Sequence, residues 1–273
     1  MLAQFFNRKR SVKSSFVALI LTFITAHVSA QEMVFILAGQ SNMAGQGNSV
    51  ELPASYQKVP SNIEFYYNGY KAPLNRFRHF GPEIGFAHEI SRQFPHATIK
   101  LIKFAVGGTS LYAWDPQWTA TRARLTHNAS AGPLFKKLIK TIKIQFNEKE
   151  SKLAGILWMQ GEADAKYPNA AKQYTNNLNR FVNALRLELK SPDSPFIMGG
   201  INPPIRLFPA TEVVQQAQKM AVSRIRNLRL INTDDLSKRN DHLHYNTNGQ
   251  LELGKRFAQA FVSTRMAALS RDK

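Results

Sequence analysis

Short apolar runs alternate along the chain with segments in which apolar residues recur at helical spacing. The runs with the length and composition of buried strands lie at 33–38, 98–106, 153–159, 196–201 and 228–231. The helical segments lie at 82–94, 133–146, 174–189, 213–221 and from 247 onward. Strands that alternate with helices predict a parallel sheet covered on both faces, so the pattern indicates a single α/β domain.

Two irregular stretches interrupt this alternation and carry much of the aromatic content. The first covers about 45–80, and the second follows the strand at 98–106. The aromatic residues predicted to lie in these loops are Tyr66, Tyr67, Tyr70, Trp114 and Trp118. Rings in such loops either stack on the faces of sugars or cover the core beneath, and the sequence leaves both readings open.

The first thirty residues have the pattern of an export signal. Basic residues at 8–13 precede an apolar run at 16–26 that is shorter than the roughly 18–20 residues of a membrane span. Small residues follow at 28–30. The pattern predicts a signal peptide at 1–30, cleaved after Ala30, with a retained anchor as the alternative. The domain would then be 31–273, periplasmic or secreted, with no stable membrane anchor after cleavage.

Composition narrows the choice of compartment and partner. The chain has no cysteine, which excludes disulfides and thiol chemistry and fits a bacterial periplasm or exterior. Its formal net charge is +18, but the basic residues are scattered or face solvent opposite an apolar helix stripe, as at 136–143. No nucleic-acid motif accompanies them. The charge therefore favours a general attraction to acidic glycans over nucleic-acid binding.

The candidate chemistry begins where the first strand ends. Ser41 follows that strand in the block Gly39-Gln40-Ser41-Asn42, and Asp241-x-x-His244 comes about 200 residues later. Taken alone, the serine is a common helix cap or turn former, and the acid and imidazole could make a loop hydrogen bond. Together they indicate a Ser-His-Asp hydrolase assembled by folding.

Two more strands end in small or polar clusters, Gly107-Gly108-Thr109-Ser110 and Gln160-Gly161-Glu162. The carboxyl ends of parallel strands share one edge of the sheet, where ligands bind. Glycine allows a close backbone approach with N–H groups turned toward a ligand, as an oxyanion hole requires. The side-chain amide of Gln160 is a candidate for a further donor.

These blocks resemble those of SGNH hydrolases. The blocks that carry the likeness are Gly39-Gln40-Ser41-Asn42-Met43, Gly107-Gly108-Thr109-Ser110, Trp158-Met159-Gln160-Gly161-Glu162 and Asp241-x-x-His244. The likeness is strongest to the sialate O-acetylesterase-like branch, which includes the acetylxylan esterases of carbohydrate esterase family six, and it spans nearly all of 31–273. It implies a three-layer α/β/α sandwich of flavodoxin-like type. It also implies removal of O-acetyl groups from sugars without a cofactor.

The resemblance assigns a role to each matching residue of the triad. Ser41 corresponds to the nucleophile. His244 corresponds to the base that takes the serine proton and later protonates the leaving sugar hydroxyl. Asp241 corresponds to the acid that orients the imidazole.

The resemblance also implies an oxyanion hole. The Ser41 N–H and that of Gly107 or Gly108 would line it, with Gly108 favoured. Gln160 takes the place of an asparagine found in many SGNH enzymes, which is a departure from the superfamily pattern. Glu162 and Asp164 are expected to brace their loop and not to act as acid or base.

Several residues compete for these roles. His242 adjoins the Asp-His pair, but only one of the two histidines is expected to face Ser41, and the spacing favours His244. Asp234 and Asp235 are alternative acids interpreted as turn residues. Ser110 is a second serine at a strand end, with no base assigned to it. The remaining histidines have no metal-ligand spacing, so no metal is predicted.

The sequence thus predicts an exported serine esterase that deacetylates carbohydrate. Acetylated xylan, sialic acid and related glycans are all compatible substrates. A glycan O-acetyltransferase on the same scaffold and a non-catalytic glycan-binding protein are the alternatives.

Overall fold

The computed structural model describes residues 32–270 with the exception of residues 76 and 150. The predicted signal peptide at 1–30 therefore lies outside the described residues. The last three residues of the chain lie outside them as well.

The described residues build a central seven-stranded sheet in the order β4-β3-β6-β1-β7-β8-β9. All neighbouring strands pair in parallel except β3 and β4. The strands are β1 (Met33–Gly39), β3 (Ile63–Tyr67), β4 (Tyr70–Lys71), β6 (Ile99–Ala105), β7 (Lys152–Met159), β8 (Phe196–Gly199) and β9 (Leu228–Ile231). A separate two-stranded sheet pairs β2 (Gly47–Asn48) with β5 (His79–Phe80).

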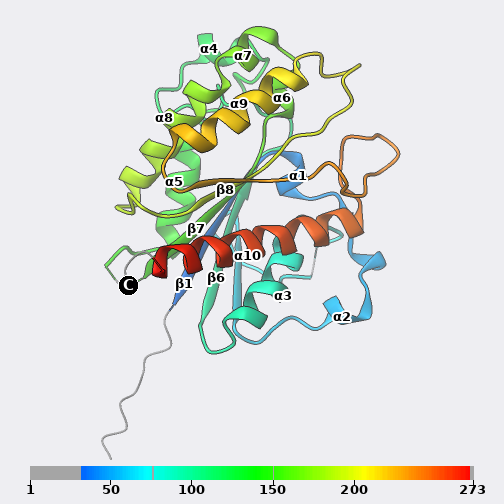
Figure 1. Cartoon of the computed structure of the whole chain (residues 1–273), viewed down its shortest axis with the longest axis vertical. Coiled ribbons are helices and arrows are strands. Elements are labelled where there is room, and N and C mark those ends of the chain that lie inside the picture. The colour runs from blue at the N-terminus through cyan, green and yellow to red at the C-terminus, as the bar shows by residue number, and fades with distance from the viewer. Residues whose placement is uncertain (1–31, 76, 150, 271–273) are drawn as a thin grey trace, which may run out of the picture.

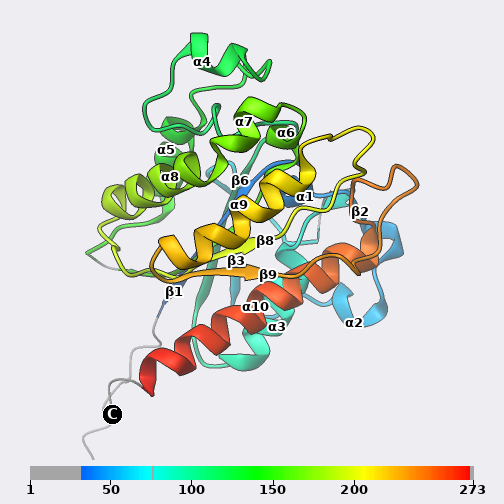
Figure 2. The same ribbon diagram turned by 45° about the horizontal axis from the view of Figure 1, so that its top comes forward.

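Helices cover both faces of the sheet (Figure 1). One face carries α3 (Glu83–Gln93) and α10 (Thr247–Leu269), which pack on each other. The other face carries α5 (Leu134–Gln145), α8 (Tyr174–Glu188) and α9 (Thr211–Arg224), as Figure 2 also shows. The short helices are α1 (Ser41–Ala44), η1 (Ser49–Glu51), α2 (Ala54–Gln57), α4 (Ala120–Arg124), α6 (Glu162–Ala165) and α7 (Pro168–Lys172). The predicted three-layer α/β/α architecture is confirmed.

The order of the strands determines where a ligand binds. From β6 through β1, β7 and β8 to β9, the order is the 2-1-3-4-5 order of flavodoxin-like sheets. The connections lead away from β1 in opposite directions, so the switch point lies between β1 and β7. The crevice beyond the carboxyl ends of these two strands is the expected ligand site of such a sheet.

The strand β1 shows why the sequence reads as a continuous apolar run. All seven of its residues are buried, because helices cover the sheet on both sides and no face of the strand meets water. The predicted strands and long helices all match observed elements to within a few residues.

The stretch 45–80 is less irregular than the sequence indicates. It contains β3 and β4, which extend the sheet past β6, so Tyr66 and Tyr67 lie on a strand and Tyr70 on its hairpin partner. The hairpin turn is made by Asn68 and Gly69, both with positive φ. An Asn-Gly pair is a typical two-residue hairpin turn, and the sequence prediction missed it.

Within the described part of the chain, no helix is both long enough and apolar enough to cross a membrane.

Candidate active site

The position of Ser41 follows from the end of β1. Gly39 has a φ of 146°, and a Cβ at this position would lie 2.1 Å from the Met159 carbonyl oxygen of β7. Only glycine permits this close approach of the two strands. The Gln40 N–H then donates to the same Met159 oxygen at 2.9 Å, and α1 begins at Ser41. The serine therefore sits at the switch point of the sheet.

The structure brings the three predicted triad residues together. His244 Nε2 lies 3.0 Å from Ser41 Oγ, and His244 Nδ1 lies 2.7 Å from Asp241 Oδ2. His242 is exposed in a left-handed conformation with a φ of 54°, and it makes neither contact. His244, as predicted, is the histidine that faces the serine.

The Asp241 carboxylate is held by its own loop. Its Oδ1 accepts the backbone N–H groups of Leu243 and His244, each at 2.9 Å. Burial pushes the pKa of Asp241 upward, but these backbone bonds and the bond from the His244 ring outweigh it and bring the pKa to about 2. An ionised Asp241 accepts the Nδ1 proton of His244. Nε2 is then left to accept the serine proton.

Among the described residues, the backbone N–H groups of Ser41, Gly107 and Gly108 have no protein acceptor. A Cβ on Gly107 would lie 3.6 Å from Ser41 Cβ, so this glycine lies against the serine. Gly108 has a φ of 69°, and its carbonyl accepts from Asn128 Nδ2 at 3.0 Å. Both glycines are exposed, as an anion-binding backbone must be. The oxyanion-hole role of Gly108 stays a prediction.

The predicted role of Gln160 as an oxyanion donor is wrong. Its side chain is fully buried, and its Nε2 donates to Thr109 O at 2.9 Å and to Asp164 Oδ2 at 2.5 Å. These two bonds use both amide protons, so none is left for an oxyanion. Gln160 instead ties the turn after β7 to the turn after β6.

The acids after β7 brace the site, as predicted. Asp164 accepts the Leu111 N–H at 3.0 Å and is fully buried, and burial raises its pKa to about 7. Glu162 is buried as well and accepts from Asn42 Nδ2 at 2.9 Å. Burial likewise raises the pKa of Glu162. Neither carboxylate contacts Ser41 or His244 through a hydrogen bond.

The rival residues have other partners. Asp235 forms a bidentate pair with Arg256 at 2.6 and 2.7 Å, which lowers its pKa to about 2. Ser110 shares a hydrogen bond with Thr126 at 2.6 Å and is fully buried. Over the described ranges, no three His, Cys, Asp or Glu side chains form a group able to hold a metal ion.

The loop aromatics divide between the two readings left open by the sequence. Trp114 is fully buried, and its Nε1 donates to Thr109 Oγ1 at 3.0 Å, so it covers the core. Tyr70 is 78% exposed. Trp118 is partly buried and lies against Gly132. Of the five rings, Trp114 is thus excluded as a platform for sugar.

Sequence reasoning missed Asn42, the residue after the serine. Its side chain is buried and bonds to Glu162, to Leu243 and to Tyr245. The available signal for a role of Asn42 at the site was its position directly after Ser41 in the block Gly39-Gln40-Ser41-Asn42. The partners could not be read from the sequence because they lie about 120 and 200 positions away.

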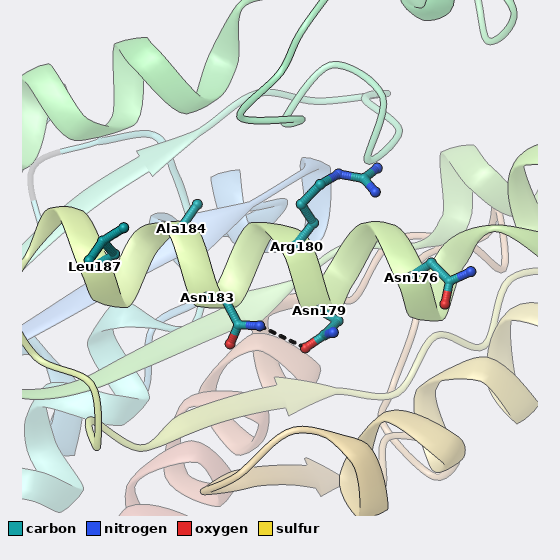
Figure 3. Close-up of a pocket in the computed structure, with 6 residues that line it drawn as sticks. All are labelled: Asn176, Asn179, Arg180, Asn183, Ala184 and Leu187. Atoms are coloured by element: carbon teal, nitrogen blue, oxygen red, sulfur yellow. Dashed lines mark hydrogen bonds between the residues drawn. The ribbon is translucent and has the colours of Figure 1, made fainter.

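A second concave surface lies on α8, away from the triad's loops. Figure 3 shows its lining residues, all from this one helix: Asn176, Asn179, Arg180, Asn183, Ala184 and Leu187. Asn183 Nδ2 donates to Asn179 Oδ1 at 3.0 Å. None of these residues contributes to the site around Ser41.

A doubly wound α/β domain with hydrogen-bonded serine, histidine and aspartate at the carboxyl edge of its sheet has the architecture of an SGNH-like hydrolase. The model of the family described as "Carbohydrate esterase, sialic acid-specific acetylesterase" matches residues 31–263. The chain therefore belongs to this family of carbohydrate acetylesterases, and it is a carboxylic ester hydrolase.

The chain is similar to proteins from Arabidopsis thaliana and Xanthomonas citri. A probable carbohydrate esterase of Arabidopsis thaliana is 26% identical over 254 residues, which cover 84% of this chain and 90% of that protein. The crystal structure of this same Arabidopsis protein superposes with a TM-score of 0.70 at 25% identity, covering 85% of this chain and 98% of the other. A carbohydrate acetylesterase from Xanthomonas citri shares the fold, with a TM-score of 0.65 at 17% identity over 83% of this chain and 55% of the other.

Proposed function

We propose that this protein removes O-acetyl groups from carbohydrate through an acyl-enzyme formed on Ser41. The observation that carries the proposal is the pair of hydrogen bonds at His244, to Ser41 Oγ at 3.0 Å and to Asp241 Oδ2 at 2.7 Å. Such a chain of three groups activates a hydroxyl that is a weak nucleophile at its ordinary pKa.

In the first half of the reaction, Ser41 Oγ attacks the acetyl carbonyl carbon while its proton passes to His244 Nε2. The carbonyl oxygen becomes negative and accepts from the N–H groups of Ser41 and of Gly108 or Gly107. The intermediate collapses as the bond to the sugar oxygen breaks and His244 protonates that oxygen. The sugar leaves with a free hydroxyl, and the acetyl group stays on the serine.

In the second half, water replaces the sugar. His244 takes a proton from the water, whose oxygen attacks the acetyl carbon. The second intermediate collapses to acetate, and the proton returns from His244 to Ser41 Oγ. Asp241 stays ionised throughout and stabilises the imidazolium. No step needs a cofactor.

The test is acetate release from a panel of acetylated sugars, with Ser41→Ala as the control. The panel includes O-acetylated sialic acid, because the family description names it, and acetylated xylan. We expect wild-type protein to release acetate from at least one of them in water, and Ser41→Ala to release none while keeping the wild-type circular dichroism. Acetate transfer only in the presence of an acceptor sugar would indicate an acetyltransferase. Sugar binding without any acetate release would indicate a non-catalytic protein.

We further propose that the protein is exported and acts in the periplasm or outside the cell. The support is the basic, apolar and small-residue pattern of 1–30, which ends just before the first strand begins at Met33. Expression of the full chain in a bacterial host with intact export tests this directly. Mass spectrometry of the periplasmic or secreted protein should give Gln31 as the N-terminus, and recovery of uncleaved protein in the membrane fraction would contradict it.

A further inference from the structure

The Asn42 side chain holds the chain on both sides of the base. Its Oδ1 accepts the Tyr245 N–H at 3.1 Å, and its Nδ2 donates to the Leu243 carbonyl at 3.2 Å. Leu243 and Tyr245 are the two neighbours of His244. One buried amide, on the residue next to Ser41, therefore fixes the backbone from which the imidazole projects.

Glu162 supports the orientation of this amide. Its Oε1 accepts from Asn42 Nδ2 at 2.9 Å, and the carboxylate is 2% exposed. The Leu243 carbonyl can only accept and the Tyr245 N–H can only donate, so these two backbone groups require the same orientation of the Asn42 amide. The amide oxygen is then left for the Tyr245 N–H. We call the two hydrogen bonds of Asn42, to Leu243 and to Tyr245, the bracket around His244.

The four residues come from three separate parts of the chain. Asn42 lies in α1 after β1, Glu162 begins α6 after β7, and Leu243 and Tyr245 belong to the loop before α10. Asp241 and His242 of this loop are exposed. The contact through Asn42 is thus a buried attachment of the His244 loop to the sheet edge that carries Ser41.

We infer that Asn42 and Glu162 are positioning residues that keep His244 Nε2 within hydrogen-bond reach of Ser41 Oγ. They touch no reacting atom and act through His244. The inference rests on the proposed function, because it gives these residues a role in that reaction. A misplacement of about 1 Å at a reacting group can cost on the order of a hundredfold in rate, so loss of the bracket lowers kcat more than it changes KM.

The amide of Asn42 and the carboxylate of Glu162 can be exchanged between the two positions by mutation. Asn42→Asp removes the donor to Glu162 and Leu243 and sets two carboxylates against each other. Glu162→Gln is milder, because its amide oxygen still accepts from Asn42. In the double variant Asn42→Asp/Glu162→Gln, the new glutamine amide donates to the new carboxylate, which still accepts the Tyr245 N–H. The double variant therefore makes two of the three wild-type hydrogen bonds, and like wild type it carries a single carboxyl group.

The experiment measures kcat and KM for p-nitrophenyl acetate. We expect Asn42→Asp to lower kcat by about ten- to a hundredfold with KM changed less than about twofold. Glu162→Gln should cost at most a few-fold. The double variant relieves the repulsion between the two carboxylates but still lacks the bond to Leu243, so it should regain only part of the lost kcat. Asn179→Asp, the same substitution on the exposed face of α8, is the matched control and should behave as wild type.

Each outcome decides the inference. Unchanged kcat in a folded Asn42→Asp variant, a change confined to KM, or a double variant with a lower kcat than Asn42→Asp would overturn it. If Asn42→Asp does not fold, Asn42→Ala replaces it, because it removes the amide without adding a charge, and an unchanged kcat again counts against the bracket. If wild-type protein and Ser41→Ala are equally inactive, the proposed function fails and the inference falls with it. An active wild type with unaffected variants overturns the inference alone.

Discussion

The hydroxyl of Ser41 and the imidazole of His244 lie about 200 positions apart in the sequence and 3.0 Å apart in space. Their meeting was predictable, because residue type and placement at strand ends carried the signal. The role of Gln160 was not predictable in the same way. An amide is a donor wherever it lies, and only the fold reveals that Thr109 and Asp164 already use both of its protons.

The first prediction at the residue scale concerns the acid. Asp241→Asn keeps the shape of the side chain but cannot hold the His244 ring in the tautomer that accepts the serine proton. We expect kcat for p-nitrophenyl acetate to fall by up to about ten-thousandfold with the fold unchanged. Asp235→Asn is the control, because Asp235 pairs with Arg256 and not with a histidine. Equal kcat in wild type and Asp241→Asn would count against the triad.

The depressed pKa of Asp241 predicts a stability signature. Its folded pKa of about 2 lies below the ordinary value of 3.8 for an aspartate, so the ionised form stabilises the fold above about pH 4. That stabilisation is lost as the pH falls through the folded pKa. The Tm of wild type should exceed that of Asp241→Asn at pH 5–7, and the difference should shrink between about pH 4 and pH 2. A difference that stays constant over this range would contradict the assignment.

Two neighbouring glycines make a matched pair of tests for the oxyanion hole. Gly108→Ala places a side chain at a φ of 69°, which costs about 1–2 kcal/mol of stability, although nothing lies within 4 Å of the new methyl group. Gly107→Ala sets a methyl 3.6 Å from Ser41 Cβ without strain, so stability is kept while kcat/KM falls by about ten- to a hundredfold. Denaturant unfolding and p-nitrophenyl acetate kinetics separate the two effects. A loss of activity without loss of stability in Gly108→Ala, together with a loss of stability at unchanged activity in Gly107→Ala, would contradict these expectations.

At the scale of elements, the spacing of apolar residues was enough to predict the five main strands and the long helices. An element that is buried on one face or on both shows a matching pattern of apolar residues in its own sequence. The hairpin of β3 and β4 was missed because its strands are short and carry exposed polar and aromatic residues beside buried ones. Another element-scale feature lies beyond sequence reasoning. Lys103 on β6 and Glu83 on α3 form a buried ion pair at 2.7 Å, and both are 2% exposed.

This ion pair supports the turn that carries the serine. Lys103 Nζ also donates to the Ala44 carbonyl at the end of α1, at 2.8 Å. We expect Lys103→Met to lower the free energy of unfolding by about 3–5 kcal/mol, because it leaves the Glu83 carboxylate buried without its cation. Urea unfolding measures this loss.

The matched control for the buried pair is an exposed one. Lys143 and Glu188 lie 2.9 Å apart with side chains that are 49% and 45% exposed. Lys143→Met should change the free energy of unfolding by no more than about 1 kcal/mol. If both lysine variants lower the free energy of unfolding by the same amount, the burial of the Lys103–Glu83 pair does not make it more important for stability than an exposed pair.

At the scale of the whole molecule, the order of the strands explains why the site lies where it does. The strands that follow β1 in the sheet lie on both of its sides, β6 on one and β7 on the other. The carboxyl ends of β1 and β7 therefore form the crevice, and Ser41 and Glu162 come directly after these two strands. Alternating elements predicted the parallel sheet, and the resemblance predicted the three layers. The attachment of the His244 loop through Asn42 depends on long-range packing that no local pattern contains, whereas the edge hairpin beyond β6 had a local signal in Asn68-Gly69.

The central claim is that Ser41 is the nucleophile, and covalent trapping tests it most directly. Wild-type protein is treated with a p-nitrophenyl dialkyl phosphate, which phosphorylates activated serines, and the adduct is located by peptide mass spectrometry. The account predicts one phosphorylated site, Ser41, with loss of esterase activity in proportion to labelling, and no label in Ser41→Ala or His244→Ala. Labelling at another serine that tracks the loss of activity, or full esterase activity in Ser41→Ala, would contradict it.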